Sequence, residues 1–222
     1  MPLSTPKRYR TYLRWKKWLG TIRNEITAMI VYRHVYREVG AIVRANPKLR
    51  SPSSFYDWMH QSYTQVMVIT ICRVVDGRDD VVSLTRLMRE IERHPEVLSR
   101  RRFVGRYPSH LKSFGDHDFD HFAPAGSAHI NPRIIARQRK LLLKSAQRIR
   151  KFRHKHVAHR ADRSLRRLPT FEELNKCADL LEDLLKKYVL LIETQCLTQV
   201  LPVWQYDWKK IFRTVWIEGS TR

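Results

Sequence analysis

Apolar residues recur with a helical period along residues 11–45. The members of this stripe are Trp15, Trp18, Ile22, Met29, Tyr32, Tyr36, Val39 and Val43. This spacing predicts one long helix whose apolar face packs against a core, with arginines and lysines on its other faces. The aromatic and basic residues could also form a nucleic-acid platform, but the spacing favours core packing. Asn46-Pro47 should end the helix, because proline cannot continue the backbone hydrogen-bond ladder.

A second helix is expected from the serine-rich start at residues 51–54 to about Val75. Apolar residues occupy nearly all of its sides, most densely in the run at residues 66–72. A helix of this kind is usually deeply buried, so we expect it at the centre of the fold. The same run could by itself be a β-strand, but its continuity with the upstream period favours the helix.

Three further helices have recognisable first residues. Ser83 precedes a short apolar pattern that is stopped by Pro95, and Asn131 is followed by proline at the first helical position. Thr170, with Glu173 three residues later, forms a capping-box pattern before the last long apolar stripe. Together with the two upstream helices, these patterns predict an all-α protein.

Two parts of the chain are predicted to be less regular. Residues 95–130 contain prolines, glycines and several histidines without a sustained period, which indicates a long irregular insertion. Residues 204–217 are aromatic-rich and predict weak helix at best. We therefore expect an antiparallel helical bundle over residues 1–201, with the insertion inside it, and a C-terminal tail at residues 202–222.

Composition favours a folded and strongly basic protein. Apolar residues make up 43% of the 222 residues, and only 7 residues are glycine. The formal net charge of +22 attracts polyanions, and nucleic acid is favoured over an anionic membrane or a merely solubilising surface. No signal peptide or membrane-spanning run is visible. Cys72, Cys177 and Cys196 lack a Cys-x-x-Cys pair and indicate buried, reduced thiols in a cytoplasmic protein.

A short run of acidic and imidazole side chains lies inside the predicted insertion. Asp116, His117, Asp118, Asp120 and His121 offer oxygen and nitrogen ligands at close spacing. Such alternating runs on loops are usually solvated, and no second cluster in the sequence completes a site. We therefore predict no metal site and no cofactor.

The densest positive charge lies in residues 148–162, which read R-I-R-K-F-R-H-K-H-V-A-H-R-A-D. Apolar residues continue through this stretch, so it is expected to be the edge of a packed helix. Arg153, His156 and His159 stand three residues apart and span about a third of the helix circumference. Arginine can clamp a phosphate, and histidine can take or give a proton at neutral pH. Metal-free cleavage of RNA by its own 2′-hydroxyl requires these groups.

The same stretch resembles a known motif. Residues 153–162, R-H-K-H-V-A-H-R-A-D, are similar to the Arg–His motif of the HEPN superfamily, with Arg153 and His159 at the motif positions. Upstream, residues 71–87 (I-C-R-V-V-D-G-R-D-D-V-V-S-L-T-R-L) resemble a segment of the abortive-infection (AbiU-type) HEPN-like proteins of bacteria. The W-K-K-W-L opening and the N-P-K-L before the second helix also fit. The resemblance covers roughly residues 12–195.

This resemblance implies a helical bundle, usually dimeric, in which the Arg–His pairs of two subunits line a shared cleft. Many members are RNases of toxin–antitoxin or phage-defence systems, and others only bind. By resemblance, Arg153 would hold the scissile phosphate and His159 would act as general acid or base. The nucleic-acid-binding residues would be Arg150, Lys155, His156 and Arg160. Asp162 would orient a neighbouring side chain or simply neutralise Arg160.

The leading hypothesis is a cytoplasmic, homodimeric, metal-independent endoribonuclease that acts on RNA, with a cognate antitoxin as a further partner and no membrane association. The alternative is a catalytically inactive HEPN-like module that binds nucleic acid or protein, because His154 stands where the family often has Asn or Asp. On that hypothesis His154 and Lys155 belong to the polar surface, and His156 is a partly buried histidine with its hydrogen bonds satisfied. A third hypothesis is a scaffold whose tail after Leu201 docks a partner.

Overall fold

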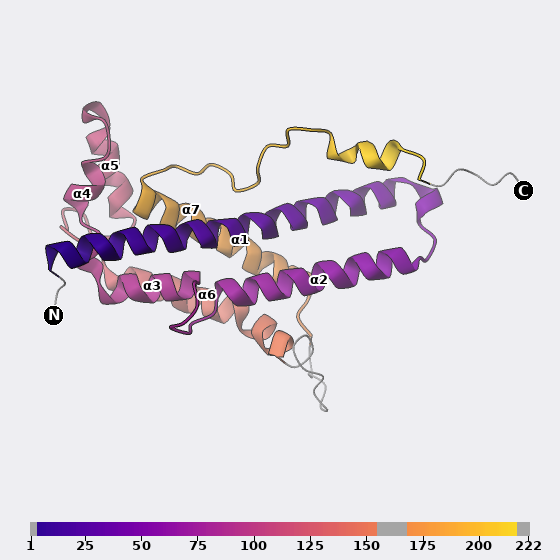
Figure 1. The fold of residues 1–222 in the computed structure, drawn as a ribbon, viewed down its shortest axis with the longest axis horizontal. Coiled ribbons are helices and arrows are strands. Elements are labelled where there is room, and N and C mark those ends of the chain that lie inside the picture. The colour runs from indigo at the N-terminus through magenta and orange to yellow at the C-terminus, as the bar shows by residue number, and fades with distance from the viewer. Residues whose placement is uncertain (1–3, 155–167, 217–222) are drawn as a thin grey trace, which may run out of the picture.

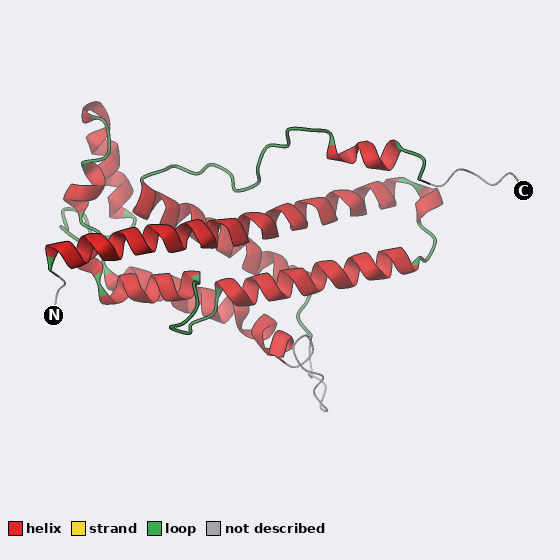
Figure 2. Cartoon of the chain, viewed as in Figure 1, coloured by secondary structure: helices red, strands yellow, loops and turns green. Residues whose placement is uncertain are grey.

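The protein is described here by a computed structural model that covers residues 4–154 and 168–216. Helices and the loops between them make up these two ranges, and no β-strand occurs in them (Figure 2). The α-helices are α1 (Thr5–Ala45), α2 (Ser54–Val74), α3 (Leu84–Arg93), α4 (Arg100–Val104), α5 (Lys112–Asp120), α6 (Pro132–Phe152) and α7 (Phe171–Glu193). The 3-10 turns are η1 (Pro47–Leu49), η2 (Pro95–Val97), η3 (Ser109–Leu111) and η5 (Trp208–Arg213). The predicted all-α class is confirmed.

Helix α1 organises the fold. Its 41 residues correspond to about 60 Å of helix, and in Figure 1 it runs along most of the molecule. Helices α2 and α3 follow one another back along α1, so that together they form its antiparallel partner (Figure 1). Helix α6 packs on α2, α3 and α7, while α7 also contacts α1. The short helices α4 and α5 lie at the end of the molecule where α1 begins (Figure 1).

The predicted helix starts are confirmed, because they depend on local hydrogen bonds. The Ser83 hydroxyl accepts from the backbone N–H of Arg86 at 3.1 Å, and the Asn131 side chain accepts from the N–H of Arg133 at 2.9 Å. At the start of α7, Thr170 and Glu173 exchange both hydrogen bonds of a capping box. Each side chain satisfies a backbone donor that the first helical turn leaves unpaired.

The core is built from the apolar stripes of the five longer helices. Trp15, Ile22 and Met29 of α1 are almost wholly buried, which confirms that most of this stripe is core, whereas Tyr32 is 50% exposed. The other fully buried residues include Leu19, Ile26, Met67, Ile71, Leu84, Leu87, Ile135, Leu142, Ile149, Leu181, Leu185 and Tyr188. The Tyr188 hydroxyl donates to Oε1 of Gln138 at 3.0 Å, which gives this buried polar group a partner on α6.

A buried charge joins α1 to α7. Arg33 is 6% exposed and donates to Oδ1 of Asp179 at 2.5 Å, to Oε2 of Glu182 at 3.3 Å and to the carbonyl of Asn175 at 3.4 Å. The apolar stripe of α1 predicts a polar, exposed position for this arginine, whereas a buried guanidinium requires partners. The acidic residues of α7 therefore hold the two longest helices of the bundle together.

The expectation that α2 is the central, most buried helix is wrong. Phe55 and Trp58 in its first turns are 48% and 63% exposed, and α2 has buried residues only from Tyr63 onwards. The reason is tertiary: the first turns of α2 lie beside the end of α1 that projects beyond α7, so none of the described helices covers their outer side (Figure 1). Residues 66–72 belong to this helix, so the strand alternative is excluded.

Residues 95–130 are more ordered than the predicted irregular insertion. They contain η2, α4, η3 and α5, joined through Arg100, which donates to Asp120 at 2.6 Å, to Asp116 at 3.3 Å and to the carbonyl of Ser127 at 2.8 Å. Buried phenylalanines, including Phe119, lie beneath this network. Helices of five to nine residues are too short to show a period, and they are held here by contacts between segments.

The aspartates at positions 116–120 form ion pairs and hydrogen bonds within residues 95–130. Asp116 and Asp120 pair with Arg100, and Asp118 accepts a hydrogen bond of 2.6 Å from the Tyr107 hydroxyl. Within the two described ranges, no group of three or more His, Cys, Asp or Glu side chains could hold a metal ion.

The C-terminal segment returns along α1. Trp204 and Trp208 lie beside His34, with ring centroids 6.2 Å from the imidazole, and Lys209 forms an ion pair with Glu38. Cys196 lies beyond α7 and is exposed, which corrects the expectation that all three cysteines are buried in helices. No helix in the described parts of the chain combines the length and hydrophobicity needed to cross a lipid bilayer.

Candidate nucleic-acid interface

The C-terminal end of α6 presents the first half of the basic stretch. Ile149 is fully buried and Phe152 packs partly against the core, so the last turn of the helix is anchored. Arg150 and Arg153 are exposed on this turn, and the Arg153 N–H caps the helix by donating to the carbonyls of Ile149 and Arg150. The negative end of the helix dipole stabilises cations at this position.

The two arginines lie near the end of α2. Burial raises the pKa of the Cys72 thiol to about 11, and the positive charges of Arg153 and Arg150 oppose this shift. The negative charge of Asp76, in the turn after α2, raises the pKa of the same thiol. The structure therefore brings together the two segments that resemble the HEPN-like proteins, residues 71–87 and the motif arginine, although they are about 80 residues apart in sequence.

An ion pair holds α6 to the beginning of α7. Arg148 donates to Oε1 of Glu173, while Oε2 of the same carboxylate accepts from the backbone N–H of Thr170 at 3.0 Å. Glu173 thus serves both the capping box and the contact between helices. The last turns of α6 and the first turn of α7 are consequently held side by side.

Most of the predicted site residues belong to that intervening stretch. Arg150 and Arg153 are placed by the structure, as is His154, which is exposed. Lys155, His156, His159, Arg160 and Asp162 lie outside the described residues, so their roles stay predictions. What the structure defines is the platform: two exposed arginines on an anchored helix end, next to the turn after α2.

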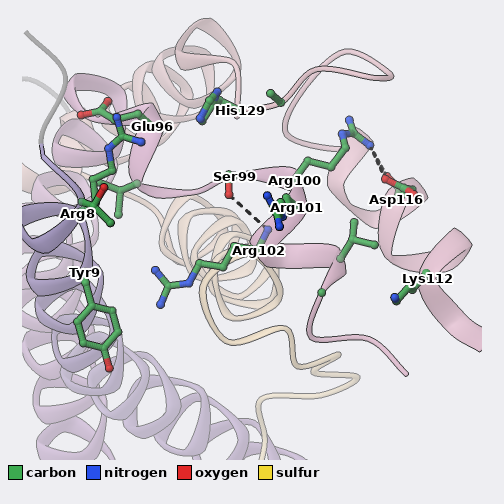
Figure 3. Close-up of a pocket in the computed structure, with 15 residues that line it drawn as sticks. Arg8, Tyr9, Glu96, Ser99, Arg100, Arg101, Arg102, Lys112, Asp116 and His129 are labelled. Atoms are coloured by element: carbon green, nitrogen blue, oxygen red, sulfur yellow. Dashed lines mark hydrogen bonds and ion pairs between the residues drawn. The ribbon is translucent and has the colours of Figure 1, made fainter. Parts of the chain in front are cut away.

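A second basic region lies at the opposite end of α6. A pocket of about 1170 Å³ opens between the first turns of α1 and the α4–α5 subassembly (Figure 3). Arg8 and Tyr9 of α1 line one side, and Arg100 reaches across to Asp116 on the other (Figure 3). Arg102, between them, lies over the Tyr12 ring at 3.9 Å. Arg100 and Arg102 therefore have structural partners, and the pocket is less suited to phosphate than its arginine content indicates.

The sequence reading missed the outer face of α6. Arg133, Arg137, Lys140 and Lys144 are all exposed and recur at steps of three and four residues. The signal was present in the sequence, because the helix contains eight arginines and lysines and no acidic residue.

Comparison with known families gives one match over most of the chain. A family model described as AbiU2, of the HEPN type, matches residues 12–207. The match includes all seven α-helices apart from the first turns of α1. No curated protein and no solved structure was found to match the chain.

Proposed function

The chain belongs to the AbiU2 family of HEPN proteins, and on this premise we propose that it is a metal-independent endoribonuclease of an abortive-infection or toxin–antitoxin system. Membership of the family indicates a role of the nuclease or abortive-infection type. The observation that supports the finer proposal is the motif arginine itself. Arg153 is exposed at the end of α6 beside Arg150, and no described acidic residue forms an ion pair with either side chain.

The proposed reaction is a transesterification within the RNA chain, in which the phosphorus forms a bond to the ribose 2′-oxygen and loses its bond to the 5′-oxygen. A neutral His159 takes the proton of the ribose 2′-hydroxyl, and the 2′-oxygen then attacks the adjacent phosphorus. Arg153 binds the non-bridging oxygens, whose negative charge increases in the transition state. The bond from phosphorus to the 5′-oxygen breaks, and a protonated His159 from a second copy donates its proton to that oxygen. The products are a 2′,3′-cyclic phosphate and a 5′-hydroxyl.

The remaining predicted residues would serve binding. The backbone-contacting residues are Arg150, Lys155, His156 and Arg160, and Asp162 would orient a neighbouring side chain. A homodimer supplies two histidines to one scissile bond, as the reaction requires both a base and an acid. A cognate antitoxin would act by covering this end of α6.

The test is cleavage of tRNA and total RNA in EDTA by the wild type, His159→Ala and Arg153→Ala. His110→Ala is the matched control, because His110 is an exposed histidine on η3 at the other end of the molecule. We expect the control to cleave normally and either motif variant to lose about 10²–10⁴-fold in rate. Products of the wild type should carry 2′,3′-cyclic phosphate. Equal cleavage by His159→Ala would show that the activity belongs to a contaminant or to another site.

The second candidate is a catalytically silent RNA-binding protein, and His154 favours it. This exposed histidine directly follows the motif arginine, where the family often has Asn or Asp. A silent binder would cleave nothing in any form, while salt-sensitive RNA binding would persist in the wild type and in His159→Ala alike.

A further inference from the structure

Helix α6 differs from the rest of the bundle in its charge. It carries eight arginines and lysines and no acid over residues 132–152, whereas its neighbour α7 contains six acidic residues. Two of the α6 cations are used within the fold: Arg139 forms a two-pronged ion pair with Glu92 at 2.6 and 2.9 Å, and Arg148 pairs with Glu173. The other cations have no ion pair with any residue in the described ranges.

Five of these free cations form one line along the helix. They are Arg133, Arg137, Lys140, Lys144 and Lys151, and we call this set the outer stripe. At 100° per residue, its members fall within about 60° of one another around the helix axis. They lie on the side opposite the buried residues Ile135, Leu142, Ala146 and Ile149, and each of them is exposed.

The outer stripe is long and ends at the candidate site. Arg133 and Lys151 are 18 residue steps apart, which corresponds to about 27 Å along the helix. Around the helix axis, Arg150 lies about 100° from the stripe and Arg153 about 160° from it. These two arginines therefore extend the positive charge from Lys151 around the end of the helix. A phosphate backbone on the stripe would therefore pass the helix end at which the motif arginine is placed.

We propose that the outer stripe binds the phosphate backbone of a double-stranded RNA stem and so delivers an adjacent unpaired segment to the Arg153 end of α6. This inference rests on the proposed function, and it names the substrate class: a structured RNA with a stem of at least about 27 Å beside its cleavage point.

The side-chain types on the stripe select the stem over unpaired RNA. Proteins that bind single strands stack bases on exposed aromatic rings, whereas a double-stranded stem is recognised mostly through its phosphates and 2′-hydroxyls. The one aromatic residue of α6, Phe152, packs against the core. An acidic protein partner is less favoured, because protein interfaces are poor in lysine and rich in aromatic residues. Leu141 is the large apolar residue exposed on α6, and it lies at the flank of the stripe.

The test measures binding in a form that does not cleave. In a His159→Ala background, Arg137→Gln/Lys140→Gln/Lys144→Gln removes three stripe charges. Arg10→Gln/Lys16→Gln/Lys17→Gln removes three exposed charges from α1, none of which forms an ion pair within the described ranges, and is the matched control. The probes are a fluorescein-labelled RNA hairpin with an 11-base-pair stem and an unpaired oligonucleotide with the sequence of its loop. Affinity is measured by anisotropy at several salt concentrations, and circular dichroism verifies that each variant is folded.

Each lost phosphate contact should lower the slope of log K against log salt by about 0.7–0.9. Three contacts give a decrease of about 2.1–2.7, which at 0.15 M salt corresponds to about 50–170-fold weaker hairpin binding. The affinity of the α1 control for the hairpin should decrease less than threefold. The affinity for the unpaired oligonucleotide should decrease only a few-fold in either variant. In the active form, the stripe variant should raise KM and leave kcat within about twofold.

Three outcomes would overturn the inference. Equal losses for the stripe and α1 variants would mean that only net charge matters, and equal losses for hairpin and oligonucleotide would mean that the stripe does not select a stem. Unchanged RNA binding together with lost binding of a polyglutamate peptide would assign the stripe to an acidic protein. Because binding is measured with a variant that lacks the motif histidine, absence of RNase activity would refute the proposed reaction without affecting this result.

Discussion

Neutralising the acidic partners of Arg33 should cost more stability than removing Arg33 itself. The guanidinium is buried on α1, whereas the Asp179 and Glu182 side chains on α7 are 60% and 20% exposed. In Asp179→Asn/Glu182→Gln the positive charge stays in the interior and has only neutral acceptors, such as the Asn175 carbonyl at 3.4 Å. In Arg33→Met the methionine fills the volume of the aliphatic part of the arginine side chain, and the carboxylates of Asp179 and Glu182 can turn to water.

The magnitudes follow from this asymmetry. A buried charge that loses its partner costs about 3–5 kcal/mol, and the neutral acceptors around Arg33 should reduce this to about 2–3 kcal/mol for the double variant. Loss of an ion pair whose acidic partners are partly exposed lowers the free energy of unfolding by about 0–1 kcal/mol, so we expect a decrease of about 1 kcal/mol for Arg33→Met. The triple variant should lie within about 0.5 kcal/mol of Arg33→Met, because Asp179 then has no charge to neutralise and Glu182 has only its partly exposed ion pair with Lys186.

Urea unfolding followed by circular dichroism measures these free energies, provided that the m-values agree. Lys176→Met, which removes a fully exposed pair with Glu172, should leave the unfolding midpoint unchanged and serves as the control. The reasoning would be refuted if Arg33→Met were as destabilising as the double variant. That result would mean that the carboxylates depend on Arg33, and not the reverse.

Two other predictions concern packing and pH. Gly115→Ala would place Cβ 2.7 Å from Cδ2 of Tyr107 and should destabilise by about 1–3 kcal/mol, whereas Gly20→Ala, with no atom within 4 Å, should stabilise by about 0.4–1 kcal/mol in thermal unfolding. Burial raises the pKa of Cys177 from 9.0 to about 11, so the unfolded thiol ionises first. Stability should therefore fall between pH 9 and 11, by at most about 1.4 kcal/mol per pH unit, and less steeply in Cys177→Ala.

The parts of the fold that could be predicted from sequence are those set by neighbouring residues. Ser83, Asn131 and Thr170 each cap the first turn of a helix within three residues, so their side chains mark the boundary directly. The heptad-like repeat of α1 likewise predicted its buried face, because residues seven apart lie on the same side of a helix; Trp15, for example, is fully buried. Local patterns suffice when the partner atoms are close in the chain.

Features that depend on distant segments could not be predicted in this way. Trp58 is apolar but exposed, because its burial depends on which helix covers the first turns of α2. The short helices α4 and α5 have no period of their own and are positioned by Arg100, whose partners are 16 to 27 residues away. The same limit applies to the candidate site: the motif predicts a role for Arg153, and only the fold places that arginine near the end of α2.

The charge of α6 makes its stability and its ligand interdependent. Arg133–Arg137, Arg137–Lys140 and Lys140–Lys144 are like-charged neighbours one turn apart, and such pairs destabilise a helix by about 0.2–0.5 kcal/mol each. The apolar face of the helix offsets this repulsion only when it is docked on the bundle. A bound polyanion would relieve the repulsion and raise the melting temperature. Selection for a more stable α6 and selection for RNA binding would thus act in opposite directions on the same four side chains.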